Sequence, residues 1–352
     1  MNKLRYIVVV FFSLLALNVS VAQEEQGEDV NAGEIVMEHI SDSYEWHITK
    51  IGGTDIVIPL PVILYSHNSG WHLFSSHHLY PVGKEHEGFK IATEGDYEGK
   101  IVETSATGEE VRPIDISITK TVLALLINCL ILVLIILGCA RWYRNKKPED
   151  PAPKGFVGFM EMFIMMVEND VIKACIGKEY KRYSPYLLTA FFFIFVNNIM
   201  GIIPIFPGGA NVTGNIAVTF VLALCTFIAV NVFGNKEYWK EILWPEVPTW
   251  LKFPVPIMPA IELFGIFTKP FALMIRLFAN IMAGHSAILA LTSIIFVTVS
   301  MGVVVNSLMT GVSFLFIIFM DCMEILVAFI QAYVFTMLSS VFIGLSRQEH
   351  AE

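Results

Sequence analysis

The chain has 352 residues, of which 55% are hydrophobic and only 16% are charged, and its mean hydropathy is +0.62. This composition excludes an ordinary soluble protein of that size and indicates a membrane protein. The formal net charge of −9 comes mainly from residues 23–119, which hold 18 Asp or Glu against 5 Lys or Arg. We expect no nucleic-acid partner for so acidic a chain.

The N-terminus has the pattern of a secretory signal. Lys3 and Arg5 precede the apolar run 7–17, and the small residues that end at Ala22 suit a cleavage site. We therefore expect residues 1–22 to be a signal peptide. A retained signal anchor is the alternative.

Residues 23–118 are expected to form an acidic region on the outer side of the membrane. All five cysteines lie outside it, so packing alone must hold it together. Alternating stretches at 55–60 and 71–74, punctuated by glycines, predict a small β-rich region within residues 52–112. Seven of the nine histidines also lie here. Their spacing matches no common zinc pattern, which favours solvated or locally hydrogen-bonded rings over a metal site.

Residues 121–140 form the first candidate span, at about the 20 residues that a helix needs to cross hydrocarbon. Four basic residues follow at once and place that end in the cytoplasm by the positive-inside rule: Arg141, Arg144, Lys146 and Lys147. Residues 154–183 mix aromatic and charged side chains, which suits an amphipathic helix lying along the cytoplasmic interface.

Residues 185–205 and 212–233 are the next two spans, joined by a short turn without Lys or Arg that we expect to lie outside. Asn197, Asn198 and Asn211 fall near the outer half of this hairpin. They are candidates for lining a channel, and hydrogen bonding between helices is an equally good interpretation.

The last hundred residues hold two apolar tracts, 256–299 and 312–345, that are each too long for a single upright crossing. Breakers between residues 300 and 311 predict a turn, so we expect a hairpin of two long, oblique helices. The fold class is thus an all-α polytopic membrane protein. It has about five membrane helices in residues 119–352, two of them long and tilted, an interfacial helix, and the β-rich region at the N-terminus.

Arg276 lies within almost continuous apolar sequence. Its guanidinium cannot lose its proton, and too much apolar chain flanks it for snorkelling, so the site must offer a carboxylate, a polar cavity or both. Other ionisable groups in the hairpin are sparse. Glu262 and Lys269 precede Arg276 at seven-residue intervals, and His285 follows it by nine residues, on roughly the opposite side of its helix.

Two segments of the hairpin resemble a known family. Arg276-Leu277-Phe278-Ala279-Asn280-Ile281-Met282-Ala283-Gly284-His285 resembles the signature of subunit a of the rotary F-type ATP synthase of bacteria. Glu324-Ile325-Leu326-Val327-Ala328-Phe329-Ile330-Gln331-Ala332-Tyr333-Val334-Phe335 resembles the signature of its last helix. The likeness covers about residues 118–350 and includes the hairpin motif at 198–204. The region 52–112 and the signal peptide lie beyond the minimal pattern of the family.

The resemblance implies a non-catalytic stator subunit of the F0 sector in the bacterial inner membrane. Arg276 would face a ring of c subunits, each with one membrane carboxylate, while two offset half-channels pass H⁺ or Na⁺ to and from the ring. Peripheral-stalk b subunits and, indirectly, the F1 sector are the further partners. Matching by position makes Asn280, His285, Glu324 and Gln331 half-channel or arginine-proximal residues.

Two other classes of function remain as alternatives. A secondary transporter could use Arg276 for an anionic substrate, but the chain shows no internal repeat. A receptor with a ligand-binding exported segment leaves Arg276 without a use. No phosphate-binding loop or cofactor motif occurs, so ATP chemistry must belong to partners.

Overall fold

The computed structural model describes residues 42–51, 54–93, 95, 97–104, 110–144, 146–147, 151–203, 207–244, 257–298 and 302–347. The predicted signal peptide, residues 1–22, lies outside these ranges. The chain divides into two compact units. One comprises Met1–Ile127 with Ile203–Ala210, and the other Asn128–Ile202 with Asn211–Glu352.

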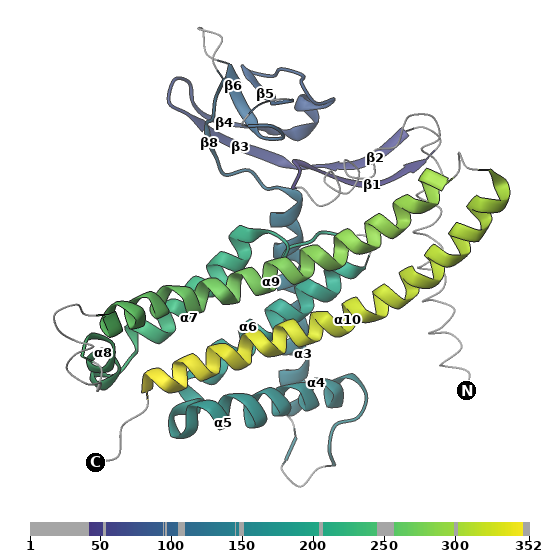
Figure 1. Cartoon of the computed structure of the whole chain (residues 1–352). Helices are drawn as coiled ribbons and strands as arrows, with labels where there is room; N and C mark the ends of the chain where they lie inside the picture. The colour runs from purple at the N-terminus through teal and green to yellow at the C-terminus, as the bar shows by residue number, and fades with distance from the viewer. Residues whose placement is uncertain are drawn as a thin grey trace. The chain divides into compact units, whose positions relative to one another are not determined.

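The described residues of the first unit form eight short strands in three antiparallel sheets, drawn in purple and blue in Figure 1. They are β1 (Glu45–Ile51), β2 (Thr54–Pro59), β3 (Pro61–Ser66), β4 (Gly70–Ser75), β5 (Phe89–Ile91), β6 (Ile101–Thr104), β7 (Glu110–Val111) and β8 (Ile114–Asp115), with the short 3-10 helix η1 (Ser76–Leu79) after β4. The sheet orders are β1-β2, β4-β3-β8 and β5-β6-β7.

Alternation along β3 builds the core of this unit. Val62 and Leu64 are fully buried and pack with Leu79, Phe89 and Ile101. Their strand neighbours point the other way because side chains alternate across a strand. Because this segment contains no cysteine, packing of these apolar side chains stabilises it without a disulfide.

Hydrogen bonds tie the first unit to the start of the first membrane helix. The backbone N–H of Lys120 donates to the carbonyl of Ser43 at 2.9 Å, and that of Thr121 donates to Asp42 Oδ1 at 3.0 Å. These N–H groups belong to the first turn of the helix, where no intrahelical partner exists. The carboxylate and carbonyl thus cap the helix.

The second unit is helical. Its elements are α3 (Lys120–Arg144, which begins in the first unit), α4 (Phe156–Met165), the π-helical turn η2 (Met166–Ile172), α5 (Lys173–Ile176), the 3-10 turn η3 (Gly177–Glu179), α6 (Tyr180–Ile202), α7 (Ile216–Val232), α8 (Lys236–Leu243), α9 (Ile257–Val297) and α10 (Val303–Arg347). Four helical stretches among the described residues are long and apolar enough to cross a membrane. There are five if α7 and α8, bent by 97° from one another, form one span. The predicted polytopic membrane protein is therefore confirmed.

The two C-terminal helices differ in detail from the prediction. α9 runs unbroken through Pro270 for 41 residues, and α10 begins at Val303 rather than near residue 312. Asn306, expected in the turn, lies inside α10, where its Oδ1 accepts a hydrogen bond from Thr298 Oγ1 at 2.9 Å. That bond lets a polar side chain join the two helix ends instead of breaking the second one.

Within this unit, α9 and α10 lie side by side as the long green and yellow rods of Figure 1, and α10 also packs against α5, α6 and α7. Small residues on α10 permit close approach. A Cβ at Gly344 would lie 2.2 Å from the carbonyl oxygen of Cys175, so glycine is required there for α10 to touch α5. The backbones of α5 and α10 are thus in direct contact.

Candidate functional site

Arg276 presents its guanidinium on the surface of α9. The residue is exposed, and within the described ranges it has no hydrogen bond and no ion pair. The residues that line the hollow next to it include no carboxylate: apart from Lys269 and Thr268 they are apolar. A guanidinium midway along a membrane helix calls for a carboxylate, a polar cavity or both, and none of the described residues pairs a carboxylate with Arg276.

An open hollow of about 310 Å³ lies beside Arg276. Its walls come from α9 and α10 and are formed by Thr268, Lys269, Ala272, Leu273, Arg276, Leu338 and Phe342. Lys269 lies over the Phe342 ring, with Nζ 5.8 Å from the ring centre. Both cations of α9 therefore border one recess, and none of its lining residues is acidic.

His285 and Glu324 meet across α9 and α10. Nδ1 of His285 lies 2.6 Å from Oε1 of Glu324, and the two side chains are 18% and 5% exposed. The oxygen lies away from the direction of the ring N–H, so this close contact is not an aligned hydrogen bond and Oε1 has no other partner among the described residues. His285 and Glu324 thus form a close, buried contact between an imidazole and a carboxylate on two different helices.

Two contacts between α9 and α10 show which parts of the two helices lie at the same level. His285 contacts Glu324, while Arg276 shares its hollow with Leu338, so the helices are antiparallel. Gln331 lies between Glu324 and Leu338 on α10 and is therefore level with the part of α9 between Arg276 and His285. The nine residues from Arg276 to His285 correspond to about 14 Å along the axis.

Gln331 and Asn280 differ in accessibility. Gln331 is 7% exposed, whereas Asn280, one turn after Arg276, is exposed. Neither side chain makes a hydrogen bond within the described part of the chain. Both amides are thus free to interact with water or a partner.

The three asparagines predicted near the outer hairpin are engaged within the protein. Asn197 accepts a hydrogen bond from Asn128 Nδ2 at 3.0 Å and donates to the carbonyl of Phe193 at 2.7 Å. Asn198 accepts from Thr213 Oγ1 at 2.6 Å and donates to the carbonyl of Ala328 at 3.4 Å. These bonds join α6 to α3, to the start of the next span and to α10.

Asn211 lies in the connection before α7. Its Oδ1 accepts from the backbone N–H of Gly214 at 2.8 Å, which closes the turn that leads into the helix. Its Nδ2 lies 4.0 Å from the sulfur of Met282 on α9, three residues before His285. Among the described residues none of the three asparagines hydrogen-bonds directly to Arg276, His285 or Glu324. Asn128 was not singled out from the sequence, although a lone amide in the apolar span 121–140 was a usable signal.

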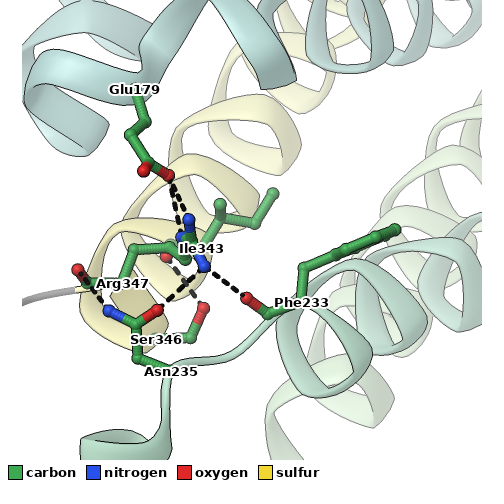
Figure 2. Close-up of polar contacts among 6 residues, drawn as sticks. All are labelled: Glu179, Phe233, Asn235, Ile343, Ser346 and Arg347. Atoms are coloured by element: carbon green, nitrogen blue, oxygen red, sulfur yellow. Dashed lines mark hydrogen bonds and ion pairs between the residues drawn. The ribbon is translucent and has the colours of Figure 1, made fainter.

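A cluster at the C-terminal end of α10 was also not foreseen (Figure 2). Arg347 pairs with Glu179 of η3 and donates through Nη1 to the carbonyl of Phe233 at 3.0 Å and to Asn235 Oδ1 at 2.8 Å. Asn235 in turn donates to the carbonyl of Arg347 at 3.2 Å. The cluster fixes the end of α10 to the bend between α7 and α8 and to the turn before α6.

Fold and site together define a polytopic membrane protein. Its last helical hairpin carries a buried acid–base pair and an arginine, Arg276, that has no ion-pair partner among the described residues. The model of the ATP synthase A chain family matches residues 123–344, which is more than half of the chain. The chain belongs to this family.

Curated relatives agree with the family match. The chain is 44% identical over 246 residues to an ATP synthase subunit a of Chlorobium phaeobacteroides, with 68% of each chain covered. It is 40% identical over 251 residues to that of Chloroherpeton thalassium, with 69% of this chain and 71% of the relative covered. A third, from an Anaeromyxobacter species, is 35% identical over 338 residues, which is 92% of this chain and 72% of the relative.

The N-terminal part matches a different model. Residues 35–119 correspond to a domain of unknown function. This range holds all eight strands of the first unit.

Proposed function

We propose that the chain is the stator subunit a of the F0 sector of a rotary ATP synthase, and that Arg276 interacts with the membrane carboxylates of a rotating c-subunit ring. The observation that carries the proposal is the exposed guanidinium of Arg276, which has no partner within the described residues and lies beside an open hollow. Membership of the ATP synthase A chain family supports the same role.

The physical reason is the cost of charge in lipid. A c-subunit carboxylate must be neutral where the ring faces hydrocarbon, because an ion there costs several kcal/mol. Opposite Arg276 it can be ionised, since the guanidinium stays charged at every accessible pH. The same fixed charge repels cations that would otherwise pass directly between the two half-channels, so ring rotation becomes the only route.

His285 and Glu324 are proposed as the acid–base pair of the outer half-channel. They lie about 14 Å from the level of Arg276 along α9, which offsets them from the arginine. Gln331 and Asn280 would be polar groups between that pair and Arg276. The hydrogen bonds of Asn197, Asn198 and Asn211 favour a supporting role for them at the wall of the channel.

The proposed topology follows from the charges next to the first span. Arg141, Arg144, Lys146 and Lys147 place the end of α3 in the cytoplasm. Residues 1–22 are then a signal peptide, residues 23–118 form a periplasmic region, and residues 119–352 form the channel domain in the inner membrane, with a cytoplasmic C-terminus. The helix from residue 156 lies at the cytoplasmic interface, and α9 and α10 cross obliquely, because 41 and 45 residues exceed one upright crossing.

The proposed partners are the c-subunit ring, the b subunits of the peripheral stalk and, through them, the F1 sector. The transported ion is H⁺ or Na⁺, since the selective carboxylate belongs to the c subunit. Co-purification of c and b subunits with this chain tests the assembly directly. A chain that purifies alone from mild detergent would contradict the proposal.

The functional test replaces Arg276. Arg276→Ala is expected to abolish ion-driven ATP synthesis while the complex still assembles, because the lost group is a charge that faces a partner. Arg276→Lys is expected to fail badly too, since a compact ammonium lacks the planar fork. Arg144→Ala, which removes a guanidinium at the cytoplasmic end of α3, is the matched control and should retain synthesis. Normal synthesis in the Arg276 variants would refute the stator role.

A further inference from the structure

Asp321 is a third ionisable group beside the His285–Glu324 contact. It lies one turn before Glu324 on α10 and is half-buried, whereas Glu324 is 6% exposed. Side chains three apart on a helix are neighbours, with about 5–6 Å between their Cβ atoms. Asp321 is therefore adjacent to the buried carboxylate and is more accessible than it.

The electrostatic surroundings of Asp321 are limited to this cluster. In the part of the chain that the structure describes, the ionisable groups that act on it are Glu324, on its own helix, and His285, on α9. The α6 helix packed against this part of α10 contributes the amide of Asn198, which carries no charge. The three groups thus form one isolated acid–base cluster inside an apolar helix pair.

The order of these groups along the hairpin gives them distinct positions. Arg276 shares its hollow with Leu338, and His285 contacts Glu324. Moving along α10 away from the level of Arg276, Gln331 comes first, then Glu324, and Asp321 last, about 4–5 Å beyond Glu324. Asp321 is the member of the cluster farthest from the arginine.

Glu324 supplies an independent reason for a proton donor at this point. Its Oε1 is buried, lies 2.6 Å from His285 without an aligned hydrogen bond, and has no other partner among the described residues. A buried oxygen in this state is stabilised when a neighbouring group supplies a hydrogen-bonding proton. Asp321, one turn away on the same helix and less buried, is such a neighbour.

We propose that Asp321 is the entry group of the outer half-channel, which receives protons from the aqueous side and passes them to Glu324 and His285. This inference rests on the proposed function. In each step the carboxyl O–H bond of Asp321 breaks while a new O–H bond forms on the Glu324 carboxylate, directly or through one water. A hydronium ion from the aqueous side then protonates the Asp321 carboxylate and leaves as water. Each step is a proton transfer, and nothing is oxidised or reduced.

The charge of Asp321 also sets the proton supply. The negative charge of an ionised Asp321 attracts protons to the neighbouring His285–Glu324 pair. Proton entry should therefore continue to a higher pH with this charge than without it. Removing that charge should leave entry efficient in acid and slow it in alkali. This pH dependence separates a relay role from a purely structural one.

The test uses the whole complex in liposomes with F1 facing outwards, so that the lumen corresponds to the outer side. ATP synthesis driven by a fixed potassium-diffusion potential is measured at lumen pH values on both sides of neutrality. Asp321→Asn should lower the rate about tenfold in an alkaline lumen and much less in an acidic one. The pH of half-maximal rate should move down by about one unit.

Two variants serve as controls. Asp321→Glu keeps the carboxylate and should retain most of the activity and the original pH profile. Cys322→Ser changes the exposed neighbouring residue and should have no effect.

Three outcomes overturn the proposal. The Asp321→Asn complex synthesises ATP as fast as the unmodified complex at every lumen pH, or its rate is lowered by the same factor at every lumen pH. In the third, neither Asp321→Asn nor Asp321→Ser joins the complex, which would assign Asp321 to folding. Arg276→Ala, measured alongside, distinguishes the two levels of inference. An inactive Arg276 variant with an unaffected Asp321→Asn variant overturns the relay alone, and an active Arg276 variant overturns the stator role itself.

Discussion

Gly284 leaves the space that the carboxylate of Glu324 fills. A Cβ built on Gly284 would lie 3.2 Å from Glu324 Oε1, which is closer than nearly all Cβ contacts in proteins. The glycine that precedes His285 therefore has a steric role of its own: it lets the carboxylate approach α9 closely enough to reach the imidazole 2.6 Å away.

Substitution of Gly284 should disturb the His285–Glu324 contact more as the new side chain becomes larger. Gly284→Ala is expected to displace the carboxylate by a few tenths of an ångström and to lower proton flux several-fold, about 1 kcal/mol in barrier. Gly284→Val should nearly abolish proton flux. Passive proton conduction through F0 in vesicles measures both. Gly265→Ala on the same helix, where a Cβ meets nothing within 4 Å, is the control.

The His285–Glu324 contact predicts reciprocity. His285→Ala or Glu324→Ala should slow proton entry, and each should change its pH dependence. The double exchange His285→Glu with Glu324→His should recover more flux than either single exchange, because it restores one acid and one base at the same contact. Strictly additive losses in the double-mutant cycle would show that the two residues work independently.

The Arg347 cluster predicts a loss of stability at the C-terminal end of α10. Arg347→Gln removes the ion pair with Glu179 and the bonds to Phe233 and Asn235, which should cost about 2 kcal/mol after allowance for exposure. Glu179→Gln should cost well under half of that, because Glu179 is 51% exposed. Unfolding in detergent, with the exposed Lys181→Gln as control, checks the ranking. Equal effects of the three substitutions would contradict it.

The first unit should respond to acid through Glu87. A hydrogen bond to His72, 2.8 Å away, lowers the pKa of the Glu87 carboxyl below its ordinary value of 4.5. Because the folded value is the lower one, the stabilisation is fully present above pH 4.5 and is lost as the pH falls through the folded value.

Glu87→Gln should therefore be less stable than the unmodified chain at neutral pH and equal to it in strong acid. Hydrogen exchange of peptides from residues 54–93 in the full chain, measured against denaturant at several pH values, reports this stability. Glu85→Gln is the neighbouring control. A difference between Glu87→Gln and the unmodified chain that persists unchanged into acid would mean that the charge of Glu87 is not responsible.

The sequence singled out the charged residues of the candidate site but not the contacts between them. Arg276 was conspicuous because a permanent charge in an apolar tract needs a reason, and His285 with Glu324 because ionisable groups are sparse in the hairpin and these two match the family signatures by position. The spacing of a single chain does not reveal which carboxylate oxygen an imidazole reaches or that Gly284 makes the room. Those depend on the register of α9 against α10, which only tertiary packing fixes.

Helix boundaries and polar partners were harder to predict for a related reason. Pro270 does not break α9, and Asn306 is accommodated in α10 by a bond to Thr298. Propensity rules describe a residue among its sequence neighbours, whereas here a side chain on another helix end satisfies the polar group. Asn197 illustrates the same limit, since its partner Asn128 lies 69 positions away.

The backbone contact between Gly344 and the Cys175 carbonyl has a mechanical consequence. In the proposed role, a ring driven past Arg276 would exert an equal and opposite force on α9 and α10, and a stator that deformed would lose part of each step. Side chains can rotate under load, but two backbones in contact can only be compressed, and interiors packed this closely have low compressibility. Gly344 thus lets α10 rest directly on the backbone of α5. Through this stiff contact the reaction torque of the proposed motor would pass from the hairpin to the other helices of the stator.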